Sequence, residues 1–185
     1  KMGYNYWSSP VRGQNVYKFS DGYNQAATTG TGTPWNRFYV YNESNDYFVA
    51  SITNEITLNS ASVFQPARGY AIRGKNSFPD KITSTSPAAL FEFKGTPQNG
   101  DFSYTLKYTN SARGYNMVGN PYPSNLNFDD LYEANSTKIE GVAYCWTNND
   151  DAIISQQSSD YVGNNYAIYN GTGGTSATYF GYNNK

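Results

Sequence analysis

The residues of this chain that could do acid–base chemistry are its acidic side chains, because it contains no histidine. Fourteen Asp and Glu residues are available, and a glycosidase needs two of them facing each other about 5–10 Å apart. Asp129 and Asp130 do not form such a pair, since adjacent residues of a helix diverge; they suit the first turn of a helix instead. Without histidine, no Ser-His-Asp or Cys-His site can form within the chain. We therefore predict that the protein is not an enzyme.

Two turns rich in Asn and Asp, residues 42–46 and 148–151, could supply oxygen ligands to a hard cation. Neither turn has the spacing of an EF-hand loop. Asn149, Asp150 and Asp151 are the candidate metal ligands, and Ca²⁺ is the one cofactor that the sequence leaves open. The alternative interpretation is an ordinary polar turn.

Aromatic residues make up 17% of the chain, against 15% charged residues. Sugar rings stack on exposed aromatic faces, while Asn, Asp and Arg side chains bond their hydroxyls. Trp35 follows a Gly/Thr-rich loop, so it is the best candidate for such a platform, with Tyr39 and Tyr41 on the strand after it. The alternative is that these three rings pack in the core.

Charge and cysteine content exclude other classes. The net charge is −1 and no basic cluster is present, which argues against nucleic acid binding. No apolar run reaches 18 residues, so we expect no membrane span. The single cysteine, Cys145, lies in an alternating segment and is predicted to be a small buried residue.

Short apolar segments between turn signals predict an all-β fold with antiparallel sheets. The clearest hairpin is predicted from alternation in residues 90–94 and 102–108, joined by a turn at 95–101. Further strands are expected at residues 16–19, 38–41, 47–52, 68–74, 142–147, 166–169 and 178–182.

Residues 114–135 organise the second part of the chain. A strand is expected at 115–118, and the two prolines within 119–123 end it. One short helix is expected at 127–135 with Asn127 as its N-cap. Residues 4–11 share the pattern of residues 115–122, and residues 35–46 resemble 144–151 more loosely. We predict one β-sandwich module over 1–185, jelly-roll-like or built from two related halves, 1–110 and 111–185.

Five segments carry a family resemblance: YNYWSSPV, RGYAIRG, FKGTPQNGD, GYNMVGNPYPSNLNFDDLYEAN and AYCWTNND. In this order they resemble a module of large secreted or surface proteins of Bacteroidota, which often lies upstream of a type IX secretion sorting domain. The resemblance implies an extracellular or cell-surface location, a role in adhesion or scaffolding, and no established catalytic residues. It also implies that the chain is a fragment whose closing strand is absent, which would leave a sheet edge open to strand addition.

The sequence thus predicts a non-catalytic extracellular adhesion or scaffolding module of a bacterial surface or secreted protein. Surface glycans or other surface proteins are its expected partners. Two alternatives remain open at this point. One is a carbohydrate-binding module of a secreted enzyme, and the other is a subunit of an extracellular filament joined by strand addition.

Overall fold

A computed structural model describes residues 3–20, 31–52, 55–79, 85–86, 90–146 and 166–175. The strand pairs are antiparallel, and the described residues contain one α-helix, so the predicted all-β fold with one short helix is confirmed. The face-to-face sandwich of two sheets stays a prediction.

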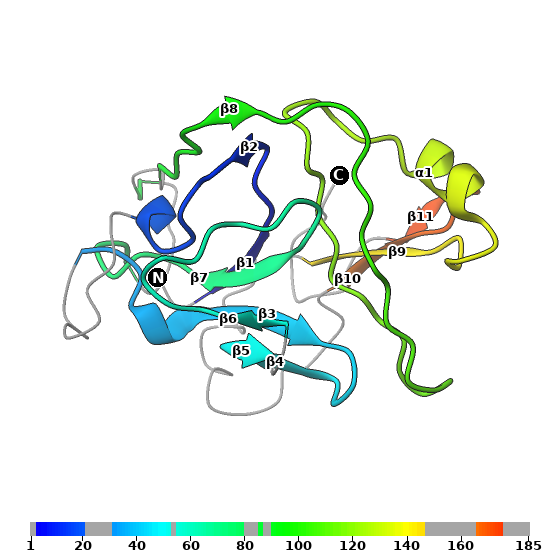
Figure 1. Cartoon of the computed structure of the whole chain (residues 1–185), viewed down its shortest axis with the longest axis horizontal. Helices are drawn as coiled ribbons and strands as arrows, with labels where there is room; N and C mark the ends of the chain where they lie inside the picture. Colours follow the sequence, from blue (N-terminus) through cyan, green and yellow to red (C-terminus); the bar gives the residue numbers. More distant parts are fainter. Residues whose placement is uncertain are drawn as a thin grey trace.

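The main sheet has four strands in the order β1-β7-β3-β4 (Figure 1). Their bounds are β1 (Tyr4–Trp7), β7 (Tyr70–Arg73), β3 (Phe38–Asn42) and β4 (Tyr47–Val49). Trp7 pairs with Tyr70 and Tyr39 pairs with Ala71 across this sheet. The strands expected at 38–41 and 68–74 are therefore present, and β4 pairs with β3 as a hairpin.

Three smaller sheets and two short 3₁₀ helices surround the main sheet. A three-stranded sheet has the order β11-β10-β9, and two further pairs are β2–β8 and β5–β6. Their bounds are β2 (Val11–Arg12), β5 (Ser51–Ile52), β6 (Ile56–Thr57), β8 (Thr96–Pro97), β9 (Ala143–Trp146), β10 (Tyr166–Tyr169) and β11 (Gly174–Thr175); the 3₁₀ helices are η1 (Lys18–Ser20) and η2 (Trp35–Arg37). The strand predicted at 178–182 lies outside the described residues.

The hydrophobic core covers one face of the main sheet. Successive residues of a strand point to opposite faces, so Phe38 and Val40 are buried while Tyr39 and Tyr41 face the other way. The buried cluster consists of Val16, Tyr17, Phe19, Phe38, Val40, Ile52, Phe64, Tyr70 and Ile72.

The strand predicted at residues 16–19 is wrong, although Val16 and Tyr17 are buried as a strand would bury them. The Asn15 side chain accepts hydrogen bonds from the backbone N–H groups of Tyr17 and Lys18, at 3.0 and 2.9 Å. Such side-chain bonds compete with a ladder. They turn the backbone into η1 instead.

The predicted hairpin of 90–94 with 102–108 is also wrong. Neither segment forms a strand, and the turn expected between them instead contains β8, which pairs with β2. The chain reverses later, where the Arg113 N–H bonds the Asn110 carbonyl at 3.0 Å. In residues 90–94 the alternation still predicted which side chains share a buried face, because Phe91 and Phe93 pack against the core.

Residues 103–118 consequently form a projecting arm of two adjacent segments (Figure 1). The Asn116 side chain joins them, accepting from Lys107 N at 3.0 Å and donating to Lys107 O at 2.9 Å. At the base of the arm, the Tyr122 hydroxyl donates to the Gly100 carbonyl at 2.8 Å. The arm is thus held by side-chain to backbone bonds where a regular hairpin would use a ladder.

The strand predicted at 115–118 reduces to one isolated bridge between Arg68 and Val118. Its two hydrogen bonds run from Gly69 N to Met117 O and from Gly119 N to Ala67 O, each 3.0 Å long. Just before this bridge, the Asn116 side chain bonds to the other segment of the arm.

The helix α1 (Phe128–Asn135) forms where it was predicted. The Asn127 side chain caps it by accepting from Asp129 N at 3.0 Å. The Phe128 ring contacts Tyr169 of β10 with centroids 5.9 Å apart, and the Tyr169 hydroxyl donates to the Asp129 carboxylate at 3.0 Å. These contacts attach α1 to the three-stranded sheet. Within the described ranges, no helix combines the length and apolar character that crossing a bilayer requires.

Candidate functional site

The outer face of the main sheet, opposite the core, is lined by aromatic rings. Tyr4 contacts Tyr39 with ring centroids 5.6 Å apart. Tyr6 and Tyr41 both contact Phe48 of β4, at 5.6 and 5.4 Å. Burial, and then the neighbouring Tyr39, raise the pKa of Tyr4 to about 12. The rings of β1, β3 and β4 therefore form a continuous aromatic layer.

The three-stranded sheet attaches to this layer through two of its own rings. Trp146 of β9 stacks on Tyr6 with centroids 5.5 Å apart, and its indole N–H donates to the Tyr4 carbonyl at 2.8 Å. The hydroxyls of Tyr6 and Tyr166 are hydrogen-bonded at 2.7 Å. Tyr6, together with the Tyr4 carbonyl, thus joins the outer aromatic layer to the three-stranded sheet.

The three aromatic residues predicted as a binding platform are not brought together. Trp35 lies in η2, is partly buried and packs against the core. Tyr39 and Tyr41 share the opposite face of β3, where Tyr41 donates its hydroxyl to Asp46. Burial, and then the Asp46 carboxylate, raise the pKa of Tyr41.

The predicted calcium ligands Asn149, Asp150 and Asp151 lie outside the described residues, so that site stays a prediction. In the other acidic turn, 42–46, the oxygens have protein partners: Asn42 Oδ1 accepts from Ser44 N at 3.1 Å and Asp46 accepts from Tyr41. In the described part of the chain, no three His, Cys, Asp or Glu side chains are placed to hold a metal together.

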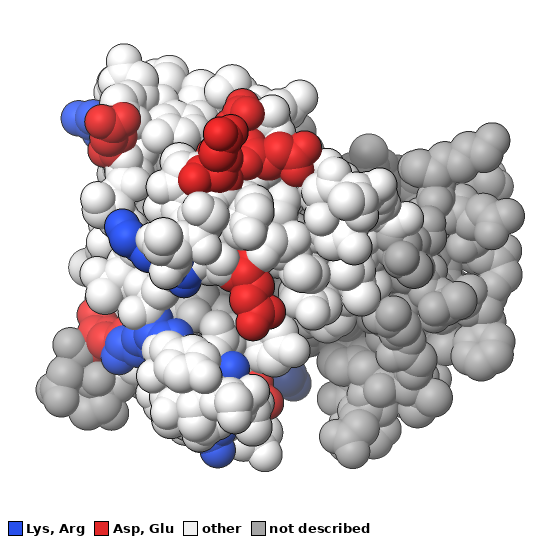
Figure 2. Space-filling view, turned by 90° about the vertical axis from the view of Figure 1, so that its right-hand side faces the viewer, with Lys and Arg blue, Asp and Glu red and all other residues white. Residues whose placement is uncertain are grey.

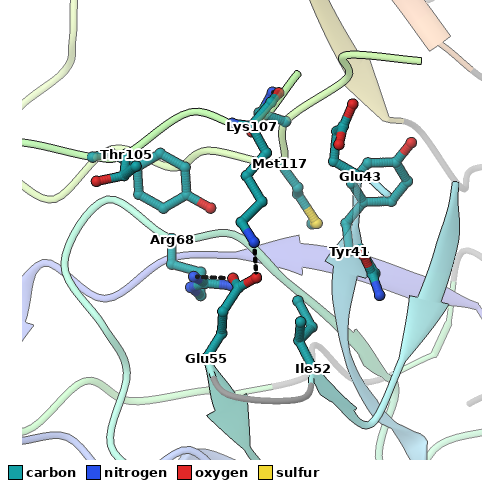
Figure 3. Close-up of a pocket in the computed structure, with 11 residues that line it drawn as sticks. Tyr41, Glu43, Ile52, Glu55, Arg68, Thr105, Lys107 and Met117 are labelled. Carbon is teal, nitrogen blue, oxygen red and sulfur yellow. Dashed lines mark hydrogen bonds and ion pairs between the residues drawn. The ribbon is translucent and has the colours of Figure 1, made fainter. Parts of the chain in front are cut away.

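A small polar pocket lies between the arm and the sheets (Figure 3). The Glu55 carboxylate sits between two cations, with Arg68 Nη2 3.6 Å from Oε2 and Lys107 Nζ hydrogen-bonded to Oε1. The Arg68 guanidinium also lies over the Tyr104 ring, 5.6 Å from its centroid. The cavity measures about 20 Å³, which is room for one water molecule. This cluster is suited to fastening the arm and is too small to hold a sugar.

A second acid fastens the arm nearer its tip. Glu43 is buried, and its carboxylate accepts from Thr109 N at 2.7 Å and from Thr109 Oγ1 at 2.6 Å. These hydrogen bonds, the side-chain one first, lower the pKa of Glu43, and the N–H of Gly114 and the charge of Arg113 act in the same direction. The charged form of Glu43 is therefore the form that the arm requires.

Three exposed tyrosines lie on the arm and on β9, and we call them the tyrosine surface: Tyr108, Tyr115 and Tyr144. They are 74%, 56% and 47% exposed. Tyr115 and Tyr144 contact each other with ring centroids 5.7 Å apart. Gly114 lets the Tyr108 ring approach, because a Cβ there would lie 2.9 Å from it. Desolvation, and then the nearby Tyr115 hydroxyl, raise the pKa of Tyr144.

Sequence reasoning missed this surface, since it placed Tyr108 on the buried face of a hairpin. The signal that could have found it is the Thr-Asn-Ser-Ala-Arg-Gly run directly after Tyr108, which marks a turn. A ring next to the tip of a projecting arm has little protein around it. On this side of the molecule acidic side chains gather in the upper part, while Lys and Arg lie mostly toward the left and lower parts (Figure 2). Asp129, Asp130 and Glu133 of α1 are exposed.

Cys145 is exposed, so the prediction that it is buried is wrong. It belongs to β9, which is the last strand of its sheet among the described strands. The neighbouring rings of Tyr144 and Trp146 make the contacts of this strand, and the small Cys145 side chain is left at the surface.

A large cleft is lined by three segments, and Figure 1 shows these segments at the end of the molecule away from α1. Its volume is about 940 Å³, and segments 13–19, 75–78 and 90–94 line it. We call it the lysine cleft, because three of its lining residues are Lys18, Lys75 and Lys94. Sequence reasoning missed it as well, since the three lysines are far apart in the chain.

The fold and these surfaces define an all-β domain with an aromatic outer layer, a projecting arm and one large cleft. The family model of a domain of unknown function, DUF8693, matches residues 1–184, and the chain belongs to this family. No curated protein and no solved structure matches the chain significantly.

Proposed function

We propose that this domain is a non-catalytic adhesion or scaffolding module of an extracellular bacterial protein. The observation that carries the proposal is the tyrosine surface. Three large rings there are exposed, although burying them would stabilise the fold. Tyrosine gives binding interfaces much of their energy, because it combines a large apolar ring with a polar tip.

The placement of the acids also supports a binding role. Glu43 and Glu55 are engaged by the arm, and Asp46 is engaged by Tyr41. An acid that catalyses proton transfer must reach a substrate. Glu43 and Glu55 instead face protein donors around a cavity of about 20 Å³, and Asp46 accepts from the Tyr41 hydroxyl. The extracellular location rests on the sequence resemblance alone.

Attachment of coated beads tests the proposal. Fluorescent beads carrying the domain should adhere to intact bacterial cells or to a glycan-coated surface, and the double substitution Tyr115→Ser/Tyr144→Ser should abolish most of this adhesion. Tyr47→Ser is the matched control, because Tyr47 is 68% exposed but lies on β4 next to Phe48 and points to the opposite face. Equal adhesion of the wild type and the double variant would contradict the proposal.

A carbohydrate-binding module of a secreted enzyme is the second candidate, and the lysine cleft favours it. A cleft of about 940 Å³ falls within the size range of ligand pockets. A glycan array separates it from general adhesion, since a carbohydrate module should give a saturable response to few structures. If binding is lost in Trp35→Ala, Trp35 takes part in sugar binding as the sequence predicts.

The third candidate is a filament subunit joined by strand addition. β4 and β9 are end strands of their sheets among the described strands, and an end strand offers backbone groups to another chain. Mass measurement at increasing concentration tests this candidate, and a strict monomer at high concentration would count against it.

A further inference from the structure

The lysine cleft has the dimensions of a ligand site, in contrast to the polar pocket beneath the arm. Its volume is about 940 Å³, against about 20 Å³ for that pocket. Ligand sites are typically concave and combine apolar walls with a few polar groups. The cleft has both kinds of lining, so the residues that line it indicate which class of ligand it would bind.

Positive charge is concentrated in this cleft. Among the described residues that line it are three lysines, Lys18, Lys75 and Lys94, and one acid, Glu92, although the whole chain has a net charge of −1. A cleft lined by one sign of charge focuses its potential on the space within it. The cleft is therefore suited to an anionic ligand, whereas α1, which carries the exposed Asp129, Asp130 and Glu133, lies at the other end of the molecule (Figure 1).

Lys75 provides a fixed part of this charge. Its side chain is buried, with only 5% of the residue exposed. The ammonium donates to the Leu90 carbonyl at 2.7 Å and lies 4.7 Å from the centroid of the Phe91 ring. A buried ammonium is costly unless partners hold it, and these two contacts help to fix the position of Lys75 in the cleft wall.

The ammonium groups of Lys18 and Lys94 are available to bind an anionic group of a ligand. The side chains of Lys94 and Glu92 are 77% and 56% exposed, and their ion pair measures 2.9 Å. An exposed pair of this kind contributes little to stability, so a ligand anion can replace Glu92. Lys18 is exposed, and its ammonium forms no ion pair or hydrogen bond within the described ranges.

Apolar groups lie beside these cations. Phe78 is half-buried in the cleft wall, and Leu90 is 70% exposed at its side. Gln14 and Asn15 also line the cleft. Aromatic and apolar walls pack against the C–H face of a sugar ring, while amides and ammonium groups bond its hydroxyls and acidic substituents.

We infer that the lysine cleft binds an acidic saccharide, with Lys18 and Lys94 on its acidic groups and Phe78 against a sugar ring. This rests on the proposed function as a binding module and names a ligand class for it. The shared chemistry is an anionic group on a sugar, which either a carboxylate or a sulfate supplies.

Calorimetric titration of the whole domain at low salt tests the inference with three probes: oligogalacturonate, dextran sulfate fragments and neutral dextran oligosaccharides. We expect at least one acidic probe to bind and the neutral one not to bind. Binding of oligogalacturonate alone assigns carboxylate recognition, and binding of dextran sulfate alone assigns sulfate recognition. Lys18→Ala/Lys94→Ala should weaken binding by about tenfold or more, since each loses a charge-assisted hydrogen bond.

Lys138→Ala is the matched control, because Lys138 is exposed just beyond α1 and away from the cleft. It should change the affinity by less than about twofold, because Lys138 is not among the residues that line the cleft. Phe78→Ala should weaken binding even at high salt, where charge effects are screened. The unfolding midpoints of the lysine variants should equal that of the wild type, and Lys18→Gln alone replaces the double variant if it does not fold. Phe78→Ala should lower the midpoint somewhat, because it removes a half-buried ring, so its affinity is measured where it is fully folded.

Equal binding of the neutral probe, or an equal loss in Lys138→Ala, would overturn the inference. The absence of binding by any acidic probe would overturn it too. If the coated beads still adhere through the tyrosine surface in that case, the proposed function stands and only the ligand class is wrong.

Discussion

Residues 4–11 and 115–122 share one sequence pattern but have different structures. In the first segment, residues 4–7 form β1 and pair with β7 at four successive positions. In the second, only Val118 makes a bridge. Trp7 contacts Phe19, Phe91 and Phe93, whereas the aligned Val118 is 51% exposed. The local pattern permits a strand in both places, but an available partner and a core to cover decide whether one forms.

The two segments meet at equivalent positions. Ser8 aligns with Gly119, and a Cβ at Gly119 would lie 2.2 Å from the Ser8 Cβ. Both segments also bond to one stretch of chain, since Trp7 pairs with Tyr70 and Val118 bridges Arg68. A two-fold relation between two halves would bring equivalent residues together in this way, although the duplication itself stays a prediction.

The largest effect should come from the aligned pair Trp7 and Val118. Trp7→Ala removes a partly buried ring from the core, and we expect a loss of about 3 kcal/mol in the free energy of unfolding. Val118→Ala should cost less than about 0.5 kcal/mol, because the side chain is exposed. Chemical denaturation of both variants measures the difference. Similar losses would mean that the second segment carries as much of the fold as the first.

Gly119→Ala should destabilise the fold by about 2 kcal/mol, because the new Cβ overlaps Ser8 in a packed contact. Ser8→Gly should restore most of this loss, since it removes the Cβ and Oγ with which the new methyl group overlaps. The Ser8 hydroxyl is buried and has no hydrogen-bond partner in the described part of the chain, so removing it leaves no donor unpaired. A double-mutant cycle without coupling between the two positions would show that the segments do not touch.

Ala67→Gly should stabilise the domain by about 0.5 kcal/mol. Ala67 has φ of 58° just before the bridge to Val118, and a side chain is strained in that region. Glycine relieves this strain but is more flexible in the unfolded chain, so the net gain is small. Ala61→Gly, at an exposed position without positive φ, should instead destabilise slightly. A loss of stability in both variants would contradict backbone strain at Ala67.

The smallest effect should appear on acidification. Because hydrogen bonds from Thr109 lower the pKa of Glu43 below 4.5, its contribution is present above that pH. It is lost as the pH falls through the lowered value. Glu43→Gln should therefore narrow the gap in melting temperature between pH 7 and pH 3, while Glu133→Gln, an exposed helix residue, should leave the gap unchanged. An unaltered gap in Glu43→Gln would mean that the arm does not depend on this charge.

The sequence predicted the elements whose signals are local. Asn127 and the two aspartates in the first turn defined α1, and the short apolar segment 38–41 before a turn defined β3. It also anticipated that Phe91 and Phe93 face the core. The pairing partners were not predictable, because the alternation of 102–108 fits any neighbouring segment, and only the Asn116 side chain fixes its actual neighbour.

The candidate surfaces were the least predictable part. Trp35 was expected to be exposed because a Gly/Thr-rich loop precedes it. The residues next to an aromatic residue in the sequence do not distinguish a ring in the core from a ring at the surface. The tyrosine surface joins residues of the arm and β9, and the lysine cleft joins three distant segments. Such surfaces depend on tertiary placement, which one sequence does not reveal.

Tyr4 and Tyr115 occupy the same position in the two segments. Substituting each with serine tests most directly whether the first segment stabilises the fold and the second binds a partner. Tyr4 packs on Tyr39 in the aromatic layer, whereas Tyr115 is exposed on the tyrosine surface. The measurement is bead adhesion per folded molecule, with the unfolding midpoint recorded in parallel. We predict that Tyr115→Ser loses adhesion at an unchanged midpoint, and that Tyr4→Ser lowers the midpoint but keeps adhesion. Full adhesion by Tyr115→Ser would contradict the account.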